Sequence, residues 1–245
     1  MKACIAQWKG TREAQEDAYT VKYFPEGVLA VVCDGMGGHQ QGALAAQTAV
    51  KAFLLAFEAE RGYSNTVDCL RRALEAANAA VGQELARREA FGGTTLLAVY
   101  MAGGVLWWVS VGDSPLLLWR HQRLVRLNAD HSLRDVYMQY VKSGVMSYED
   151  AMSQGHRLRS ALTGEAMAMV DAPPTPYPLL PGDRIILASD GVDDLLLPAV
   201  LPEEVKKLLD TRGEASLAAL IVDACMRLQL PAADNTTVVC LERPL

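Results

Sequence analysis

Short hydrophobic runs separated by turn-forming residues dominate this chain. The runs are rich in Val, Leu, Ile and aromatic residues, a composition typical of β-strands. The predicted strands are Ala18–Tyr23, Val28–Cys33, Thr94–Met101, Val105–Val111, Pro115–Arg120, Arg184–Ser189 and Thr236–Leu241. Gly103-Gly104 lies between two of these runs and His121-Gln122 follows a third, and both pairs are candidates for tight turns. The segment 94–127 is therefore predicted to form an antiparallel meander.

Longer segments with a helical period lie between the strands. Within Val67–Leu85 apolar residues recur at steps of three and four, and Asn65 or Thr66 can serve as the N-cap, which predicts an amphipathic helix. The Ala-rich stretch Gly42–Glu60 favours another helix just before it. Further helices are predicted at Ser132–Lys142, Pro202–Thr211 and Glu214–Leu228.

This order of elements predicts the fold class. Strands, a helix pair, more strands and late helices are typical of antiparallel sheets covered by helices, an α+β arrangement. The length of 245 residues corresponds to one large or two small domains. No internal repeat is present, and the Pro-rich stretch Pro173–Pro178 is too short for a domain linker. We therefore expect one domain covering residues 1–245.

Composition and charge exclude several classes of protein. With 51% hydrophobic and 21% charged residues and a mean hydropathy of +0.09, the chain lies outside the range of wholly disordered proteins. The 23 basic and 29 acidic residues give a net charge of -6 and a pI of about 5.3, so no overall positive field favours nucleic acid or an anionic membrane. We expect neither as a partner.

The cysteines and the N-terminal segment bear on the compartment. The five cysteines are an odd number and contain no C-x-x-C, which fits neither a disulfide framework nor a thiolate zinc site. They are Cys4, Cys33, Cys69, Cys225 and Cys240. The apolar stretch within Met1–Trp8 is too short for a signal peptide, and no uninterrupted apolar run approaches the roughly 18–20 residues of a membrane helix. These features favour a reducing compartment, and we expect a cytoplasmic protein.

Acidic residues recur where predicted strands end or begin. Three strands run into an aspartate beside a glycine, and two more acidic positions stand just before strands. The residues are Asp34-Gly35, Gly112-Asp113, Asp190-Gly191, Glu16-Asp17 and Asp234. In antiparallel sheets the ends of some strands share an edge with the starts of others, so these carboxylates can converge.

Convergence decides between two interpretations of these acids. An isolated Asp-Gly after a strand is an ordinary turn. Three or more gathered carboxylates repel one another unless a cation neutralises them, and oxygen-rich sites suit Mg²⁺ or Mn²⁺, with the Gly35 carbonyl as a further ligand. Two such ions make hydroxide available for phosphate ester hydrolysis. Arg12, four residues before Glu16, can then hold the phosphate through its planar guanidinium.

Taken together, these residues resemble the ordered motifs of the metal-dependent Ser/Thr protein phosphatases of the type-2C family, bacterial branch. The motifs are Arg12-x-x-Gln15-Glu16-Asp17, Asp34-Gly35-Met36-Gly37-Gly38-His39, Gly93-Thr94-Thr95, Gly112-Asp113-Ser114, Asp130-His131-Ser132, Ser189-Asp190-Gly191 and Asp234-Asn235-x-Thr237. They extend from residue 12 to residue 237, in the order of the family. The segment 141–164 also resembles the flap that lies beside the active site in this family.

The resemblance implies a fold, a cofactor and a role for each motif residue. The fold is a four-layer αββα sandwich of two antiparallel sheets, which holds two tightly bound Mn²⁺ or Mg²⁺ ions and a weaker third. The expected ligands are Asp34 as the bridge between the two ions, the Gly35 carbonyl on one of them, and Asp190 and Asp234 on the other. The resemblance also implies that Glu16 and Asp17 hold waters bound to the ions, that Arg12 holds the phosphate, that Asp113 binds the third ion with Asp190, and that Asn235 orders Asp234.

Two positions depart from the family. Gln15 stands where Asn is frequent, and Pro115 follows Gly112-Asp113-Ser114 where Arg is frequent, which removes a local ion pair. Met36 stands where animal relatives carry a histidine and bacterial relatives commonly carry Met, so no general acid is assigned there. The four histidines His39, His121, His131 and His156 lack metal-ligand spacing and are interpreted as structural or surface residues.

The resemblance implies hydrolysis of phosphoserine and phosphothreonine in proteins, with the chain opposing a Ser/Thr kinase. A second hypothesis is a catalytically weak or inactive pseudophosphatase that acts as a regulatory binding domain. The presence of Arg12, Asp34, Asp190 and Asp234 argues against it, because a decayed site usually loses one such residue. A third hypothesis is a structural cation site in a binding module, which needs neither Arg12 nor a flap.

Overall fold

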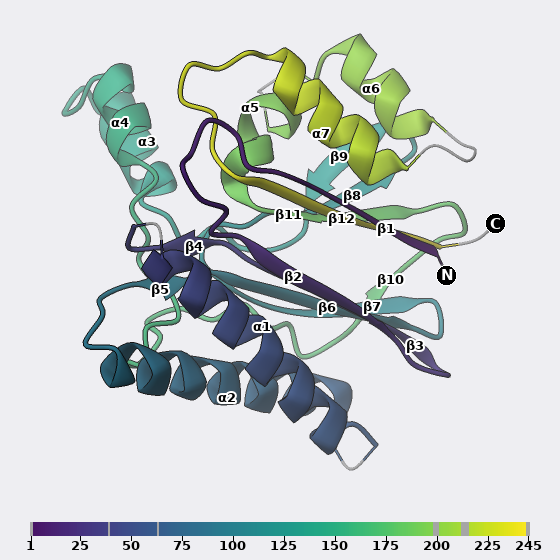
Figure 1. The fold of residues 1–245 in the computed structure, drawn as a ribbon. Coiled ribbons are helices and arrows are strands. Elements are labelled where there is room, and N and C mark those ends of the chain that lie inside the picture. Colours follow the sequence, from purple (N-terminus) through teal and green to yellow (C-terminus); the bar gives the residue numbers. More distant parts are fainter. Residues whose placement is uncertain (1, 39, 63, 198–200, 212–215, 244–245) are drawn as a thin grey trace.

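The protein consists of two five-stranded antiparallel sheets packed face to face, with helices covering both outer faces (Figure 1). The computed structural model describes residues 2–38, 40–62, 64–197, 201–211 and 216–243. The expected α+β sandwich of helix, sheet, sheet and helix layers is confirmed.

The first sheet has the strand order β1-β12-β11-β8-β9. Its strands are β1 (Lys2–Trp8), β12 (Thr236–Glu242), β11 (Arg184–Ala188), β8 (Leu116–Arg120) and β9 (Arg123–Arg126). The outer face of this sheet packs on α5 (Asp193–Leu196), α6 (Glu203–Asp210) and α7 (Leu217–Arg227).

The second sheet has the strand order β10-β7-β6-β3-β2. Its strands are β10 (Tyr177–Pro178), β7 (Val105–Val111), β6 (Leu96–Ala102), β3 (Gly27–Cys33) and β2 (Ala18–Tyr23). A two-stranded ladder of β4 (Gly35–Met36) and β5 (Gly93–Thr94) lies at its end. The long helices α1 (Gln40–Glu60) and α2 (Thr66–Arg87) cover its outer face.

Burial on both faces explains why the central strands are continuously apolar. In β3, Leu29, Val31 and Cys33 pack against α1 and α2, whereas Val28, Ala30 and Val32 pack against the other sheet. A strand that is buried on both sides has no polar face, so its sequence does not show which side faces which neighbour.

By length and composition alone, the helix α1 is long and apolar enough to cross a membrane. This supports a membrane segment only weakly, because core helices pass the same criterion. Ala45, Ala49 and Phe53 of α1 are fully buried in the layer between the helix pair and the second sheet.

Most predicted elements are present, with boundaries that shift by at most three residues. The predicted cap is confirmed, because the Asn65 side chain accepts a hydrogen bond from the Asp68 N–H at the start of α2. Glu214 at the predicted start of the last helix lies outside the described residues, and the helix is described from Leu217. The elements that the hydrophobic pattern did not predict are β1, β4, β9, β10, α4 (Tyr148–Gln154), α5 and the short 3-10 turn η1 (Asp190–Val192).

The predicted meander over 94–127 is wrong. Both tight turns are present, with positive φ at Gly103, Gly104, His121 and Gln122. However, β7 belongs to the second sheet and β8 to the first, so the chain crosses between sheets at residues 112–115. Gly112 has φ +105 and the close approach of Thr95 leaves no room for a Cβ, which makes the chain leave the sheet there.

A second correction concerns the predicted strand Thr94–Met101, which is divided into β5 and β6. The Thr95 hydroxyl accepts a hydrogen bond from the Asp34 N–H at 2.9 Å, and the Thr94 hydroxyl donates to the Asp34 carbonyl at 2.8 Å. These two threonines therefore bind the chain just after β3 instead of continuing the ladder.

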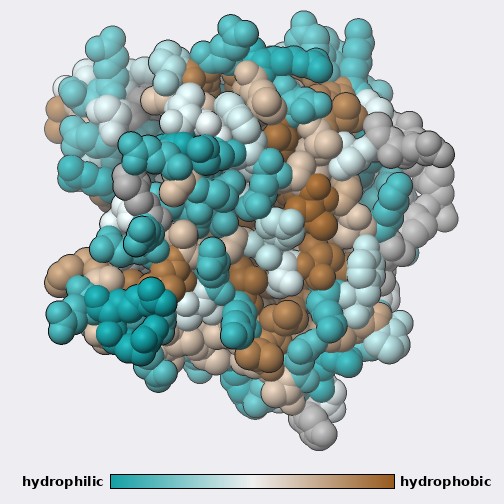
Figure 2. Space-filling view, in the orientation of Figure 1, coloured by the Kyte–Doolittle hydropathy of each residue, from teal (hydrophilic) through white to brown (hydrophobic). Residues whose placement is uncertain are grey.

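The face seen in Figure 2 carries hydrophobic side chains near its middle, where the edge strands β1 and β2 lie in Figure 1. Three large side chains of these strands, Ile5 of β1 and Tyr19 and Tyr23 of β2, are exposed. The Tyr23 hydroxyl accepts a hydrogen bond from the Ala3 N–H at 2.9 Å, which connects the two edge strands.

Candidate active site

Acidic residues from both sheets line one cavity of about 410 Å³. The cavity lies where β3 and β7 end, where β11 ends and where β12 begins. Its lining residues are Arg12, Glu16, Asp34, Gly35, Met36, Gly37, Gly38, Thr95, Asp113, His156, Arg157, Leu158, Asp190, Asp234 and Asn235. The predicted convergence of Glu16, Asp34, Asp113, Asp190 and Asp234 is therefore present, and it joins two sheets where one sheet edge was expected.

Asp34 occupies a fixed backbone position at the end of β3. Its N–H donates to Thr95, and its carbonyl accepts from the Thr94 hydroxyl and from the Thr95 N–H at 2.9 Å. Burial and then the charges of Asp190 and Asp17 hold the pKa of its carboxyl well above the usual range. The carboxylate therefore lacks a compensating positive charge.

Asp17 lies behind the cavity, at the start of β2. Its Oδ2 accepts hydrogen bonds from the hydroxyls of Thr237 at 2.6 Å and Ser189 at 2.8 Å, so it connects β2 with β11 and β12. Its Oδ1 is buried and has no hydrogen-bond partner among the described residues. Burial raises the pKa of Asp17 to about 6, against the lowering effect of these two hydroxyls.

Two glycines, Gly35 and Gly42, lie close to Glu16 at the cavity. A Cβ at Gly42 would lie 2.1 Å from Glu16 Oε2, and a Cβ at Gly35 would lie 2.5 Å from the Glu16 carbonyl oxygen. Both positions therefore require glycine. This contact seats the first turn of α1 against the residues that precede β2.

Asn235 organises the segment around Glu16. Its side-chain oxygen accepts from the Glu16 N–H at 2.7 Å, and its amide donates to the carbonyls of Lys9 at 2.7 Å and Ala14 at 3.0 Å. Its backbone N–H donates to Asp234 Oδ1 at 2.7 Å. The side chain thus orders residues 9–16, while the ordering of Asp234 comes from the backbone.

Arg12 and Asp234 form an ion pair, with Nη2 of Arg12 2.5 Å from Oδ2 of Asp234. Both side chains are partly exposed, at 56% and 39%. The sequence predicted a phosphate contact for Arg12 and a metal-binding role for Asp234, and it did not predict contact between the two side chains.

Asp190 begins η1 directly after β11, and Asp193 follows one turn later at the start of α5. Burial and the charges of Asp113 and Asp234 hold the pKa of Asp190 well above the usual range. Asp193 pairs with Arg134 at 2.8 Å, and its buried Oδ1 has no hydrogen-bond partner among the described residues. Asp193 was not predicted, although its spacing of three residues from Asp190 places it on the same side of a helical turn.

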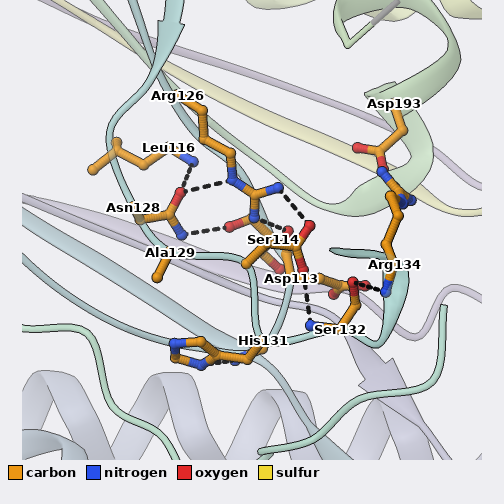
Figure 3. Close-up of polar contacts among 12 residues, drawn as sticks. Asp113, Ser114, Leu116, Arg126, Asn128, Ala129, His131, Ser132, Arg134 and Asp193 are labelled. Atoms are coloured by element: carbon orange, nitrogen blue, oxygen red, sulfur yellow. Dashed lines mark hydrogen bonds and ion pairs between the residues drawn. The ribbon is translucent and has the colours of Figure 1, made fainter. Parts of the chain in front are cut away.

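A network of polar residues supports the loop that carries Asp113 (Figure 3). Arg126 donates to the Asp113 carbonyl at 2.6 Å and pairs with Asp130 at 2.9 Å. His131 Nδ1 accepts from the Gly112 N–H at 3.2 Å, so this buried histidine is structural, as predicted. Burial, followed by the charges of Asp130 and Asp193, raises the pKa of Asp113 to about 6. Arg126 of β9, which the sequence did not indicate, supplies a guanidinium beside the loop that contains Pro115.

The segment predicted as a flap contains the end of α3 (Arg134–Lys142) and α4. His156, Arg157 and Leu158, which follow α4, line the cavity. His156 is exposed, in agreement with its interpretation as a surface residue, yet it lies at the cavity wall. His39 lies outside the described residues.

A second, larger cavity of about 940 Å³ adjoins the first and shares Arg12, His156, Asp190 and Asp234 with it. It extends from α4 to the residues after α7 and includes the exposed side chains of Tyr148 and Leu228 among its lining.

The donor set of the first cavity fits divalent cations. Several carboxylates raise one another's pKa, and buried oxygens of Asp17 and Asp193 have no hydrogen-bond partner in the described part of the chain. Within that same part, no three His, Cys, Asp or Glu side chains already surround one point in ligand geometry. Some of these side chains would therefore have to adjust before three of them could surround one cation.

Comparisons with known proteins agree with this arrangement. A family model described as protein phosphatase 2C matches residues 10–225. The serine/threonine protein phosphatase PstP of Mycobacterium tuberculosis is 32% identical over 216 residues, which are 86% of this chain and 39% of PstP. The serine/threonine phosphatase stp of Listeria monocytogenes is 31% identical over 230 residues, which are 89% of this chain and 85% of that protein.

Solved structures give the same result. A crystal structure of the catalytic domain of PstP in complex with two manganese ions has a TM-score of 0.76 and 29% sequence identity, and the match covers 98% of this chain and 96% of that one. The phosphatase MsPP of Mycobacterium smegmatis, crystallised with cacodylate, has a TM-score of 0.74 and 27% identity over 99% of this chain and 98% of that one. The chain spans about two fifths of the length of PstP and most of the length of the Listeria protein.

Proposed function

This chain belongs to the protein phosphatase 2C family, and we propose that it hydrolyses phosphoserine and phosphothreonine in proteins with the aid of Mn²⁺ or Mg²⁺. The observation that carries the proposal is the cavity between the two sheets, in which carboxylates from both sheets raise one another's pKa. Divalent cations would neutralise the negative charge of such a cluster, and carboxylate oxygens are their preferred ligands.

The proposed ligands are those of the motif residues. Asp34 would be shared between two ions, the Gly35 carbonyl would serve one, and Asp190 and Asp234 would serve the other. Glu16 and Asp17 would hold waters of these ions, and Asp113 with Asp190 would form a weaker third site. When bound, such ions supply charge neutralisation and make hydroxide available near neutral pH.

Arg12 is the proposed phosphate-binding residue. It uses Nη2 for Asp234, and the other N–H groups of its planar guanidinium can donate to phosphate oxygens. The position of Arg12 at the mouth of the cavity and its 56% exposure favour contact with a large substrate such as a phosphorylated protein.

The proposal extends to partners and location. A phosphoprotein phosphatase acts against a Ser/Thr kinase, and the expected location is the cytoplasm. A single catalytic domain over residues 1–245, with a flap over about 141–164, remains a prediction. The pseudophosphatase alternative gains no support, since the relatives are named as Ser/Thr phosphatases and every predicted acid lines or adjoins the cavity.

The test is hydrolysis of a phosphothreonine peptide and of para-nitrophenyl phosphate with Mn²⁺ or Mg²⁺, before and after chelation with EDTA. We expect EDTA or Asp34→Asn to remove at least about 99% of the activity, because one carboxylate shared by two ions has no substitute. Asp223→Asn, at an exposed position of α7, is the matched control and should retain full activity.

Unchanged turnover after complete chelation would overturn the metal-dependent mechanism. Thermal stabilisation by Mn²⁺ without any hydrolysis would instead support a structural cation site in a binding module.

A further inference from the structure

Two cysteines face each other far from the candidate active site. In the antiparallel ladder between β1 and β12, Cys4 is the direct partner of Cys240. Both side chains belong to the apolar layer between the first sheet and its covering helices. Directly opposed residues in such a ladder have Cα atoms about 4.5–5.5 Å apart, which lies within the roughly 4.4–6.8 Å range that a disulfide bridges.

The sulfur of Cys4 lies at the N-terminus of α7. The Ala218 N–H donates to Cys4 Sγ at 3.5 Å, and the neighbouring Ser216 and Leu217 also lower the pKa of Cys4. The Ser216 side chain caps the same helix by accepting from the Ala219 N–H at 3.3 Å. Several N–H and O–H donors around one sulfur stabilise its thiolate form.

The two thiols differ in character because of this placement. The interaction with the Cys240 side chain, together with the start of α7, lowers the pKa of Cys4 to about 5. Burial and the same interaction hold the pKa of Cys240 well above the usual range. Cys4 is half-buried, whereas the other four cysteines are buried. The pair thus combines a half-buried cysteine at the N-terminus of α7 with a buried cysteine beside it.

We propose that Cys4 and Cys240 form a peroxide-reactive thiol pair that closes reversibly into a disulfide. In the first step the Cys4 thiolate attacks hydrogen peroxide, the O–O bond breaks, and Cys4 sulfenic acid and hydroxide form. In the second step the Cys240 sulfur attacks the sulfenic sulfur, the S–O bond breaks, and water leaves with the Cys240 proton. Peroxide is reduced and the two thiols are oxidised, and an external thiol reverses the reaction by exchange.

This site is separate from the proposed catalytic function. Cys240 lies six residues beyond Asp234 along an extended strand, a separation of about 20 Å. The proposal therefore does not rest on phosphatase activity, and activity is not its readout.

The experiment treats the full chain with a small excess of hydrogen peroxide, blocks the remaining thiols by alkylation, and maps tryptic peptides without reduction. We expect the free thiol count to fall from five to three and a cross-link to appear between peptide 3–9, which contains Cys4, and peptide 228–245, which contains Cys240. Dithiothreitol should restore all five thiols.

Matched variants assign the reaction to this pair. Cys4→Ser should lose both the cross-link and the rapid consumption of peroxide, whereas Cys240→Ala should accumulate a Cys4 sulfenic acid that dimedone traps. Cys225→Ala, which removes a buried cysteine of α7 from peptide 213–227, should leave the cross-link intact.

The proposal is overturned if the wild-type chain shows no cross-link between peptides 3–9 and 228–245. It is equally overturned if peroxide consumption by Cys4→Ser matches that of the wild type. Because the first of these results needs only the wild-type chain, it does not depend on the folding of any variant.

Discussion

At the scale of single residues, the candidate site contains acids that are fixed beside other carboxyl groups, Asp34 and Asp190 among them. The hydroxyls of Thr94 and Thr95 hold the backbone of Asp34, and Arg126 holds the carbonyl of Asp113. A rigid backbone keeps a carboxylate near its neighbours in spite of their repulsion. A divalent cation would relieve the electrostatic repulsion between these carboxylates.

Arg12 gives the first residue-scale prediction. Because its guanidinium is expected to hold phosphate in the ground state and the transition state alike, Arg12→Ala should raise KM at least as much as it lowers kcat, with a total loss of about 10-fold or more in kcat/KM. Arg12→Lys should recover only part of this loss, since an ammonium group cannot bind two oxygens in a planar fork. Steady-state kinetics with phosphothreonine peptides measure both parameters, and an unchanged kcat/KM would remove Arg12 from the site.

Asp113 gives the second residue-scale prediction. Met36 lines the cavity without a titratable proton, so the departing serine or threonine oxygen needs a proton donor held elsewhere. Asp113 is the carboxyl proposed to hold that donor. Asp113→Ala should therefore slow phosphothreonine peptides about 10-fold more than para-nitrophenyl phosphate, whose leaving group needs little protonation.

The control for Asp113 is the occupancy of the two tighter ions, measured by calorimetry in the same variant. Equal losses on both substrates, with these ions still bound, would make Asp113 a general support of the site.

At the scale of elements, the acids of the site lie in the connections that adjoin strands, and these connections bring them to the cavity. The crossing at residues 112–115 takes the chain from one sheet to the other and leaves Asp113 between them. The turn from β11 into η1 likewise leaves Asp190 at the cavity. The strands hold the ends of these turns in place, and the turns contain acidic residues of the site.

The anchor of the flap on α2 gives an element-scale prediction. The Asn78 amide donates to the Glu165 carbonyl at 2.8 Å, and its oxygen accepts from the N–H groups of Thr163 at 3.1 Å and Gly164 at 2.9 Å. Asn78→Ala leaves three backbone groups without this partner, so we expect a loss of about 2–4 kcal/mol in the free energy of unfolding, measured in urea.

The matched control is Gln83→Ala on the exposed side of the same helix, which should change stability by less than about 0.5 kcal/mol. A loss of the same small size for Asn78→Ala would show that α2 does not anchor the segment.

At the scale of the whole molecule, the site costs stability because it gathers like charges where two sheets meet. Burial and neighbouring carboxylates raise the pKa of Asp17 and Asp113 to about 6. A carboxyl whose pKa is higher in the folded state binds protons more tightly when folded. Its contribution to stability is therefore present at low pH and is lost as the pH rises from about 4 to above 6.

This linkage predicts the behaviour of Asp113→Asn in EDTA. The uncharged amide should make the variant more stable than the wild type at pH 7, by up to about 3 kcal/mol, because the folded-state value of about 6 lies above the ordinary 3.8. The difference should shrink below pH 6 and vanish near pH 4. Urea unfolding at each pH measures it, and a wild type that is more stable than the variant at pH 7 would contradict the electrostatic account.

The sequence alone determined most of the strands, the main helices and the acids that line the cavity, because hydrophobic period, caps and strand-ending Asp-Gly pairs are local signals. It did not determine that β7 and β8 belong to different sheets, since strands buried on both faces carry no polar face to reveal their neighbours. Tertiary structure alone brought Arg126 to the Asp113 loop, paired Arg12 with Asp234, and set Cys4 opposite Cys240. Each of these contacts joins residues that are distant in sequence or depends on strand register, and only the packed molecule fixes both.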